Sequence, residues 1–265
     1  MRIMRVRHGE LDYFARWVDD ATARLWDGAP WGGGGETDRL VPLARATLLP
    51  AAQPSKIVCV GRNYRKHAAE LGNEVPAEPL LFLKPPSALL AHGAAIELPT
   101  HSERVEHEGE VGVVVGQRLR DAGENEARAA IFGLTCVNDV TARDLQRRDV
   151  QFTRGKGFDT FCPVGPWIET DVEPADLRVV VRVGGEVRQD GRTRDMIWRV
   201  PALLSFVSSV MTLEPGDLLL TGTPEGVGPL VDGDDVEVEV EGVGSLRNPV
   251  RRRKHPDAGA AAHGD

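Results

Sequence analysis

The stretch EHEGEVGVVVG, residues 106–116, places an acidic side chain at every second position of a predicted strand. Because successive side chains of a strand point to opposite faces, Glu106, Glu108 and Glu110 are expected on one face. The valine-rich half that follows is typical of a buried strand. At an effective dielectric near 20, two like charges about 4 Å apart repel by about 4 kcal/mol. Such a group of acids therefore needs protons or a cation to balance it.

A third acid, Asp139, closes another predicted strand, FGLTCVND at 132–139. If the two strands lie side by side, Glu108, Glu110 and Asp139 converge. Hard cations such as Mg²⁺ or Mn²⁺ prefer oxygen ligands, and three carboxylates with open positions are typical of a catalytic Mg²⁺ site. The alternative is a solvated strand face whose acids only meet water. We assign Glu106 to that alternative and leave it out of the cluster.

The elements that must position these acids are mostly strands. Periodicity predicts few helices, at 124–132, 141–148 with Thr141 as its cap, and 196–210 with Pro201 in its first turn. Few strands are followed by a helix of crossover length, so we expect a mixed α+β, β-rich fold rather than a Rossmann sheet. Strands are predicted at 56–60, 80–84, 94–99, 108–116, 132–139, 177–183, 217–222 and 234–244, with a hairpin at 183–191.

Composition changes along the chain indicate three parts. Residues 1–52 are predicted to form a small N-terminal subdomain, with WGGGGE at 31–36 as a flexible loop and a proline-marked junction at its end. Residues 53–250 are the predicted catalytic domain. Residues 251–265 combine charges with small residues, lack an apolar period and are predicted to be a disordered tail.

Bulk properties exclude several classes of protein. The 265 residues carry a formal net charge of −8, which argues against general binding to nucleic acid or to an anionic membrane. There is neither an apolar run of membrane-spanning length nor an apolar signal core, so we expect a cytoplasmic protein. Cys59, Cys136 and Cys162 lie far apart without a CxxC pair, which favours buried, reduced thiols. A nucleophilic cysteine partnered by a histidine remains the alternative.

Seven stretches, in order from about residue 54 to 250, resemble motifs of the fumarylacetoacetate hydrolase family in its small single-chain branch. The family commonly has an aromatic residue before the first metal glutamate and a leucine after the second, where this chain has His107 and Val111. By alternation His107 should face away from the metal. The stretches are VGRNYRKHAAELG (60–72), PLLFLKPPSALL (79–90), EHEGEVGVVVG (106–116), CVNDVTARDLQRR (136–148), GKGFDTFCPVGPW (155–167), GEVRQDGRTRDMIW (185–198) and LEPGDLLLTGTPEGVG (213–228).

This resemblance implies a fumarylacetoacetate hydrolase-type β-roll or sandwich fold, a homodimer and a Mg²⁺ or Mn²⁺ cofactor. It also implies a role for each matched residue. Glu108, Glu110 and Asp139 would be the metal ligands, and Lys156 a catalytic lysine. Arg143 and Gln146 would contact substrate oxygens, and Thr223 would bind the substrate carboxylate. His67 and Glu70 would form an acid–base dyad.

Two of these residues have a simpler interpretation: His67 could have a surface or capping role, and Lys156 could be an exposed loop lysine. Gly155 and Gly157, on either side of Lys156, predict a mobile loop. TGTPEGVG lacks the Gly-Lys-Ser/Thr ending of a phosphate loop, so nucleotide binding is rejected.

The substrates that the resemblance implies are small 2-oxo or enol acids, turned over through an enolate that the metal stabilises. The expected activity is that of a 2-hydroxyhepta-2,4-diene-1,7-dioate isomerase or of a hydrolase of C–C bonds. The alternatives are an oxaloacetate decarboxylase, an acylpyruvate hydrolase, or an inactive relative that only binds its ligand.

Overall fold

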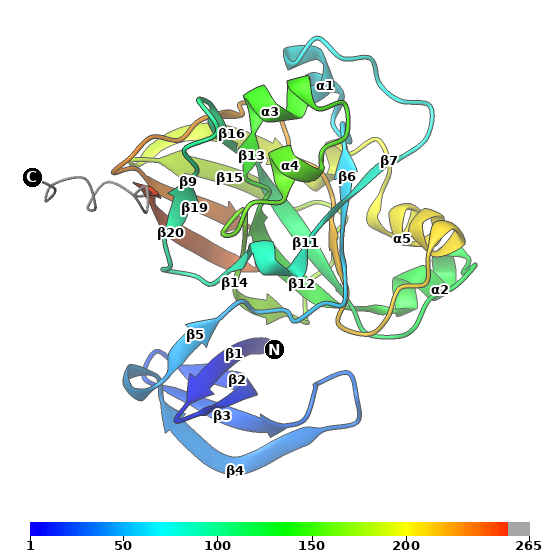
Figure 1. The fold of residues 1–265 in the computed structure, drawn as a ribbon. Helices are drawn as coiled ribbons and strands as arrows, with labels where there is room; N and C mark the ends of the chain where they lie inside the picture. Colours follow the sequence, from blue (N-terminus) through cyan, green and yellow to red (C-terminus); the bar gives the residue numbers. More distant parts are fainter. Residues whose placement is uncertain (254–265) are drawn as a thin grey trace, which may run out of the picture.

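The computed structural model of the protein describes residues 1–253. Five α-helices and twenty strands make up this part of the chain (Figure 1). The strands are β1 (Arg2–His8), β2 (Leu11–Asp19), β3 (Thr22–Asp27), β4 (Gly35–Pro42), β5 (Thr47–Leu49), β6 (Ile57–Gly61), β7 (Leu80–Lys84), β8 (Leu89–Leu90), β9 (Ile96–Leu98), β10 (Val105–His107), β11 (Gly109–Val115), β12 (Ile131–Asn138), β13 (Thr141–Ala142), β14 (Cys162–Glu169), β15 (Arg178–Val183), β16 (Glu186–Arg192), β17 (Leu218–Leu220), β18 (Gly228–Pro229), β19 (Asp235–Val240) and β20 (Gly244–Arg252). The helices are α1 (Arg65–Glu70), α2 (Glu124–Ala129), α3 (Arg143–Arg148), α4 (Thr153–Lys156) and α5 (Val200–Val210).

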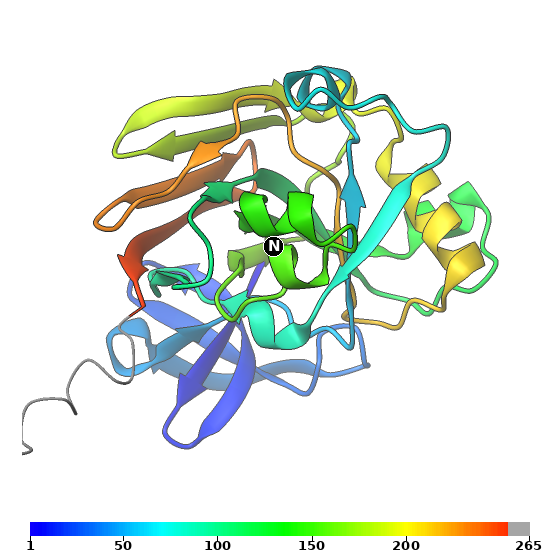
Figure 2. The same cartoon turned by 45° about the horizontal axis from the view of Figure 1, so that its top comes forward.

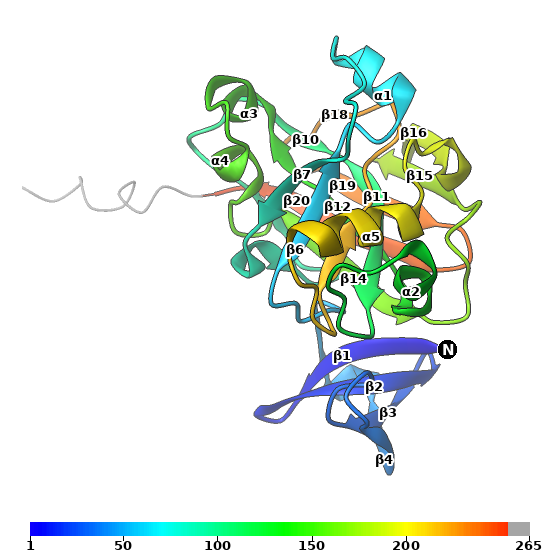
Figure 3. The same cartoon turned by 90° about the vertical axis from the view of Figure 1, so that its right-hand side faces the viewer.

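The strands form three sheets. The largest has the order β4-β3-β2-β1-β14-β12-β11-β17-β6-β7, a second has the order β16-β15-β19-β20-β9, and β13, β10 and β18 form a third. The N-terminal strands form a separate layer beneath the rest of the molecule and join the largest sheet where β1 pairs with β14 (Figures 1 and 3). The predicted β-rich α+β fold is confirmed.

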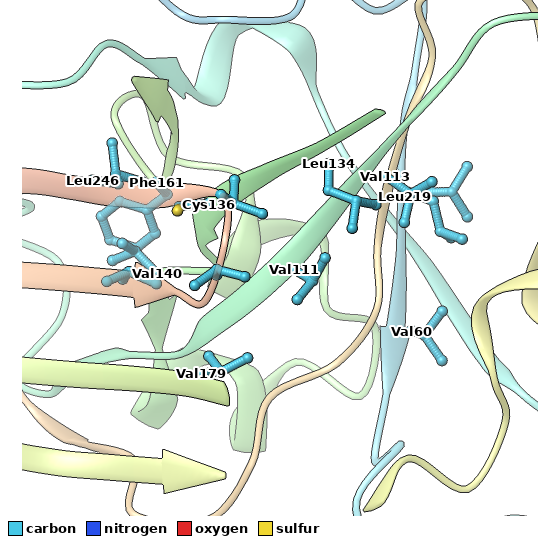
Figure 4. Packing of buried hydrophobic residues seen from close by; sticks show 14 of the residues in the cluster. Val60, Val111, Val113, Leu134, Cys136, Val140, Phe161, Val179, Leu219 and Leu246 are labelled. Carbon is cyan, nitrogen blue, oxygen red and sulfur yellow. The ribbon is translucent and has the colours of Figure 1, made fainter. Parts of the chain in front are cut away.

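Strand β11 lies at the centre, and all seven of its residues are buried. Val111 and Val113 pack with Val179 of β15 in the largest hydrophobic cluster, while Val114 faces a second cluster on the other side of the sheet (Figure 4). Because both faces of β11 are covered, its sequence is apolar at nearly every position instead of alternating. The glutamates that precede this run are therefore carried into the interior.

The helices gather at two ends of the molecule. Helices α2 and α5 lie side by side at one end, while α3 and α4 lie together near the opposite end of β11, close to α1 (Figures 1 and 2). In the described part of the chain, the longest helix has 11 residues, and none is long and apolar enough to cross a membrane. The placement of α1, α3 and α4 matters because each contributes side chains to one cavity.

Three sequence predictions about local structure are wrong. Helix α3 begins at Arg143, and the predicted cap Thr141 lies in β13, where its hydroxyl donates to the Asp139 carbonyl. The predicted loop at 31–36 is too long, because Gly35 and Glu36 begin β4; the Trp31 ring packs edge-on against Phe14 and Phe132. The predicted tail begins too early, because β20 continues to Arg252; residues 254–265 lie outside the described part of the chain.

A buried carboxylate, Asp217, fixes the entry into β17 and ties it to the segment that leads into β6. It accepts hydrogen bonds from the backbone N–H groups of Ser55, Lys56 and Glu214 and from the Ser55 hydroxyl, and it pairs with the Lys56 ammonium. Its side chain has no exposed surface. Removing it would leave three backbone N–H groups and the Ser55 hydroxyl without this acceptor.

We predict that Asp217→Ala lowers the free energy of unfolding by about 3 kcal/mol, because the loss of several hydrogen bonds to a buried carboxylate and of its ion pair both cost stability. Denaturant unfolding measures this. The control is Glu214→Gln, whose half-exposed side chain pairs with Arg118 and should change stability by less than about 1 kcal/mol. Equal effects of the two variants would contradict the anchoring role of Asp217.

Candidate metal centre and active site

Antiparallel pairing of β11 with β12 brings the three predicted acids together. Gly109 lies opposite Asn138, and the Asp139 N–H donates to the Glu108 carbonyl at 2.8 Å. The start of β11 thus meets the end of β12. One carboxylate oxygen from each of Glu108, Glu110 and Asp139 lies within 4.8 Å of the others, and all three side chains are buried. The supposition that the two strands are neighbours is therefore correct.

Two lysines neutralise part of this cluster. The Lys156 Nζ lies between Glu108 Oε2, at 2.8 Å, and Asp139 Oδ2, at 2.6 Å. The Lys84 Nζ donates to Asp139 Oδ1 at 2.6 Å and to the Val140 carbonyl. Sequence reasoning missed Lys84, although a lysine that ends the apolar strand LLFLK gave a signal. Both ammonium groups are at most 2% exposed, so they belong to the interior.

Glu106 belongs to the same buried network, which corrects its assignment to a solvated face. Its side chain is 1% exposed and accepts from Arg143 Nε at 2.7 Å and from Arg104 Nε at 2.6 Å. The Arg143 guanidinium also bonds Glu108 and donates to Gln146 Oε1 at 2.6 Å. Arg143 and Gln146 are three residues apart on α3, and Asp139 precedes that helix. Three acceptors therefore fix the orientation of the Arg143 guanidinium.

Protonation of Glu110 balances the buried charges. Burial, reinforced by Asp139 and Glu108, raises its pKa well above the usual value. Burial alone would also raise the pKa of Glu108, but Lys156 and Arg143 outweigh it and hold that pKa far below its usual value. Among the buried side chains, four carboxyls (Glu106, Glu108, Glu110 and Asp139) face three cations (Lys84, Arg143 and Lys156), so a proton on Glu110 makes this buried set neutral. Arg104, which also pairs with Glu106, is about half exposed and is not counted.

These residues fit a hard divalent cation. Each carboxylate offers about four lone-pair sites, so Asp139 and Glu108 can keep their lysine and arginine partners while they bind a metal ion. Within residues 1–253, the acid with the raised pKa, Glu110, forms one side-chain hydrogen bond, from the Gly222 N–H at 2.7 Å. A cation that displaced the Glu110 proton would leave the buried cluster with a net charge of one positive unit. That charge suits an anionic substrate.

A cavity of about 320 Å³ opens onto the three acids, and five of the other predicted site residues line it. Those five are His67, Arg143, Gln146, Lys156 and Thr223. They come from α1, α3, α4 and the segment after β17, and their roles stay predictions. Glu70 does not line the cavity wall and is about one-third exposed.

The imidazole of His67 is 5% exposed and forms no side-chain hydrogen bond within residues 1–253. Its Nδ1 lies 3.5 Å from Glu70 Oε2, but the geometry is not that of a hydrogen bond. Glu70 instead accepts from the Gly226 N–H at 3.0 Å. Burial lowers the pKa of His67, more than Glu108 raises it, so the ring is neutral at pH 7. The acid–base dyad thus remains a prediction.

Two other predicted residues have environments that differ from the expectation. Lys156 is in α4 rather than in a mobile loop, and Gly155 is needed for packing, because a Cβ there would lie 3.0 Å from the Gln146 backbone. The Thr223 hydroxyl donates to the Gly109 carbonyl and accepts from Gln189 Nε2, each at 2.8 Å. Its predicted contact with a substrate carboxylate stays a prediction. His107 bonds Gln189, away from the acids, as alternation indicated.

The cysteines do not form a nucleophilic site. All three are buried, none lines the cavity, and burial raises the pKa of the Cys136 and Cys162 thiols to about 12. Burial also raises the pKa of Cys59 well above its usual value. Because the thiolate is the reactive form, these environments oppose the cysteine alternative.

Family models and sequence relatives both relate this chain to the same group of proteins. The family model described as fumarylacetoacetate (FAA) hydrolase, C-terminal, matches residues 56–251, and the Rv2993c-like, N-terminal model matches residues 1–50. The chain is 48% identical over 240 residues to Protein Rv2993c of Mycobacterium tuberculosis, covering 89% of this chain and 91% of that protein. It is 45% identical over 210 residues to the mitochondrial oxaloacetate tautomerase FAHD1 of Arabidopsis thaliana, covering 77% of this chain and 94% of that protein.

Among solved structures, the 2-hydroxyhepta-2,4-diene-1,7-dioate isomerase from Mycobacterium marinum superimposes with a TM-score of 0.88 at 45% identity. The alignment covers 96% of this chain and 100% of that one. The similarity therefore includes both the N-terminal layer and the sheets that hold the acids.

We predict that Mg²⁺ binding releases about one proton at neutral pH, since the cation must displace the proton that the raised pKa of Glu110 retains. Lowering the pH should accordingly weaken Mg²⁺ binding.

Glu110→Gln should abolish the proton release and weaken Mg²⁺ binding by at least about tenfold. Calorimetry in buffers of different ionisation enthalpy measures both quantities. Glu225→Gln, on a side chain that pairs with Lys66 outside the cluster, is the control; unchanged affinity in Glu110→Gln would contradict the site.

We also predict that thiol alkylation leaves the folded enzyme active, because the three thiols are buried and protonated. Removal of divalent metal with EDTA should abolish activity, and added Mg²⁺ should restore it. The opposite pattern, with inactivation by iodoacetamide and indifference to EDTA, would support the cysteine alternative.

Proposed function

The chain belongs to the fumarylacetoacetate hydrolase family, and on this premise we propose that it is a divalent-metal-dependent tautomerase of a small 2-oxo acid. Oxaloacetate is the first substrate to test. The names of two relatives support this choice, since one is an oxaloacetate tautomerase and the other a 2-hydroxyhepta-2,4-diene-1,7-dioate isomerase. Both names describe reactions that move a proton within an enol-forming acid.

The observation that carries the proposal is the state of His67. The ring lines the cavity that holds the acids, its pKa is lowered by burial, and no other side chain is hydrogen-bonded to it in the described residues. A neutral imidazole with free nitrogen is the side chain best suited to accept and return a proton near pH 7. Lys156 cannot act as the base, because Asp139 and Glu108 outweigh its burial and raise its pKa.

The cations of the cavity hold the substrate and its developing charge. A divalent metal held by Glu108, Glu110 and Asp139 would supply Lewis-acid polarisation of the oxo group and the neighbouring carboxylate. Lys156 keeps a fixed positive charge beside Glu108 and Asp139, where an enolate oxygen would be stabilised. Arg143 is held by Glu106 and Glu108 and needs little rearrangement to contact an anionic substrate.

The proposed reaction transfers a proton within the substrate and consumes no water. His67 takes a proton from the carbon next to the oxo group, the bonding electrons shift towards the oxo oxygen, and the proton returns to that oxygen to give the enol. The reverse sequence regenerates the ketone. The substrate gains and loses no atoms, so the reaction is a tautomerisation.

Hydrolysis of a C–C bond is the second candidate, because Glu70 Oε2 lies 3.5 Å from His67 Nδ1. A small shift would allow Glu70 to orient the ring for activation of water. Product analysis separates the two functions. Tautomerisation of oxaloacetate in D₂O exchanges the C3 protons and conserves the four-carbon acid, whereas hydrolysis of an acylpyruvate consumes water and gives two acids.

The test is the decay of enol absorbance after oxaloacetate is added as its enol, with Mg²⁺ and a range of enzyme concentrations. We expect the decay rate to rise with enzyme and the total four-carbon acid to stay constant by NMR. A rate independent of enzyme, together with cleavage of acylpyruvates, would replace the tautomerase proposal by the hydrolase.

We predict that His67→Asn lowers kcat by about 10²–10⁴-fold, the usual contribution of a positioned acid–base group. At saturating Mg²⁺, kcat of the wild type should fall as the pH drops through the lowered pKa of His67, below the ordinary value of 6.5, because the base must be neutral. The variant should lose this limb of the pH profile while Mg²⁺ affinity is kept. An unchanged pH profile in His67→Asn would exclude this histidine as the base.

A further inference from the structure

Two arginines, Arg62 and Arg147, line the same cavity and have no role in the mechanism proposed above. Within residues 1–253, neither guanidinium forms a hydrogen bond or an ion pair. The other arginine of the cavity, Arg143, donates to Glu106, Glu108 and Gln146 and already has a role in the proposed mechanism. The cavity therefore contains two positive charges without a protein partner.

The burial of these residues places them nearer to solvent than the acids. Glu108, Glu110 and Asp139 are at most 4% exposed, whereas Arg62 is half-buried and Arg147, on α3, is exposed. The acids thus form the floor of the cavity, and the two arginines lie towards its mouth. A ligand that engages the floor with its 2-oxo acid group would extend its other end towards them.

The backbone at Arg62 supports a specific role. Its φ of 57° is in the left-handed region, which is unfavourable for a residue with a side chain. The next residue holds this geometry, because the Asn63 amide donates to the Trp198 and Thr221 carbonyls and accepts from the Trp198 N–H. Glycine would fit this backbone without strain, so an arginine here costs stability without a contact in the protein that repays it.

We propose that Arg62 and Arg147 bind the distal carboxylate of the substrate, so that the enzyme prefers 2-oxo dicarboxylic acids to monocarboxylic ones. This inference rests on the proposed function and specifies its substrate class. Arginine suits the role because its planar fork of donors matches a carboxylate. Neither residue acts on the reacting atoms, and both determine specificity.

The first experiment compares two substrates that share the same reacting group. Oxaloacetate and its 4-methyl ester both tautomerise, but only the first has a distal carboxylate. We expect kcat/KM of the wild type to be at least about tenfold higher for the diacid, since one charge-assisted contact is worth about this factor. Arg62→Gly should remove most of that preference by lowering kcat/KM for oxaloacetate alone.

Stability separates a binding role from a structural one. Because glycine accepts the left-handed backbone, Arg62→Gly should have a Tm no lower than the wild type. Arg147→Met should also reduce the preference for the diacid. The controls are Arg65→Met and Arg148→Met, on neighbouring arginines that do not line the cavity. Equal losses for the diacid and the ester, or a wild type without preference, would overturn the inference.

A binding measurement keeps this inference separate from the proposed reaction. Calorimetry with Mg²⁺ compares 2-oxoglutarate with 2-oxopentanoate, two five-carbon 2-oxo acids that differ at the distal carboxylate. We expect the wild type to bind 2-oxoglutarate about tenfold more tightly and Arg62→Gly to lose most of this difference. If the wild type tautomerises neither oxaloacetate nor its ester, the proposed function fails and this comparison decides the arginines alone: an undiminished difference in Arg62→Gly would overturn their role.

Discussion

Compensation of buried charge is the constraint on which this structure depends. Four carboxyl groups lie in the interior beside three cationic side chains, and each ionised group would be costly there without a partner. Lys84, Arg143 and Lys156 offset three of the negative charges. The raised pKa of Glu110 favours its protonated form, which removes the fourth negative charge. A divalent cation could therefore bind by replacing the Glu110 proton. The buried cluster would then carry one net positive charge, which favours binding of an anionic substrate.

The fold maintains this cluster by covering β11 on both faces. The five-stranded sheet approaches so closely that a Cβ at Gly109 would lie 2.2 Å from a methyl group of Val181. Glycine between Glu108 and Glu110 thus lets the second sheet pack against the backbone while the flanking carboxylates point the other way. The Thr223 hydroxyl bonds the Gly109 carbonyl, which ties the segment after β17 to the same point. Packing of the core and position of the acids are consequently determined together.

The sequence predicted the parts of the site that depend on local periodicity. Alternation places Glu108 and Glu110 on one face, and apolar runs locate β7, β11, β12 and β15 closely. Pairing of β11 with β12 is a long-range contact that no local pattern encodes, so Asp139 could be added only by supposition or by family resemblance. Lys84 was missed because a lysine at the end of a strand usually reaches solvent. Glu106 was misassigned because its partner Arg143 is 37 residues away. The glycines on either side of Lys156 predict a mobile loop, although at least Gly155 is needed for close packing.

The most direct test of the account is the position of a bound metal ion. A crystal grown with Mn²⁺ and measured at a wavelength that gives manganese an anomalous signal would locate the ion without reference to activity. We predict one strong peak within bonding distance of carboxylate oxygens of Glu108, Glu110 and Asp139, with Lys156 still beside Glu108. The absence of a peak there at a saturating concentration of Mn²⁺, or a peak bound by other residues, would contradict this metal site.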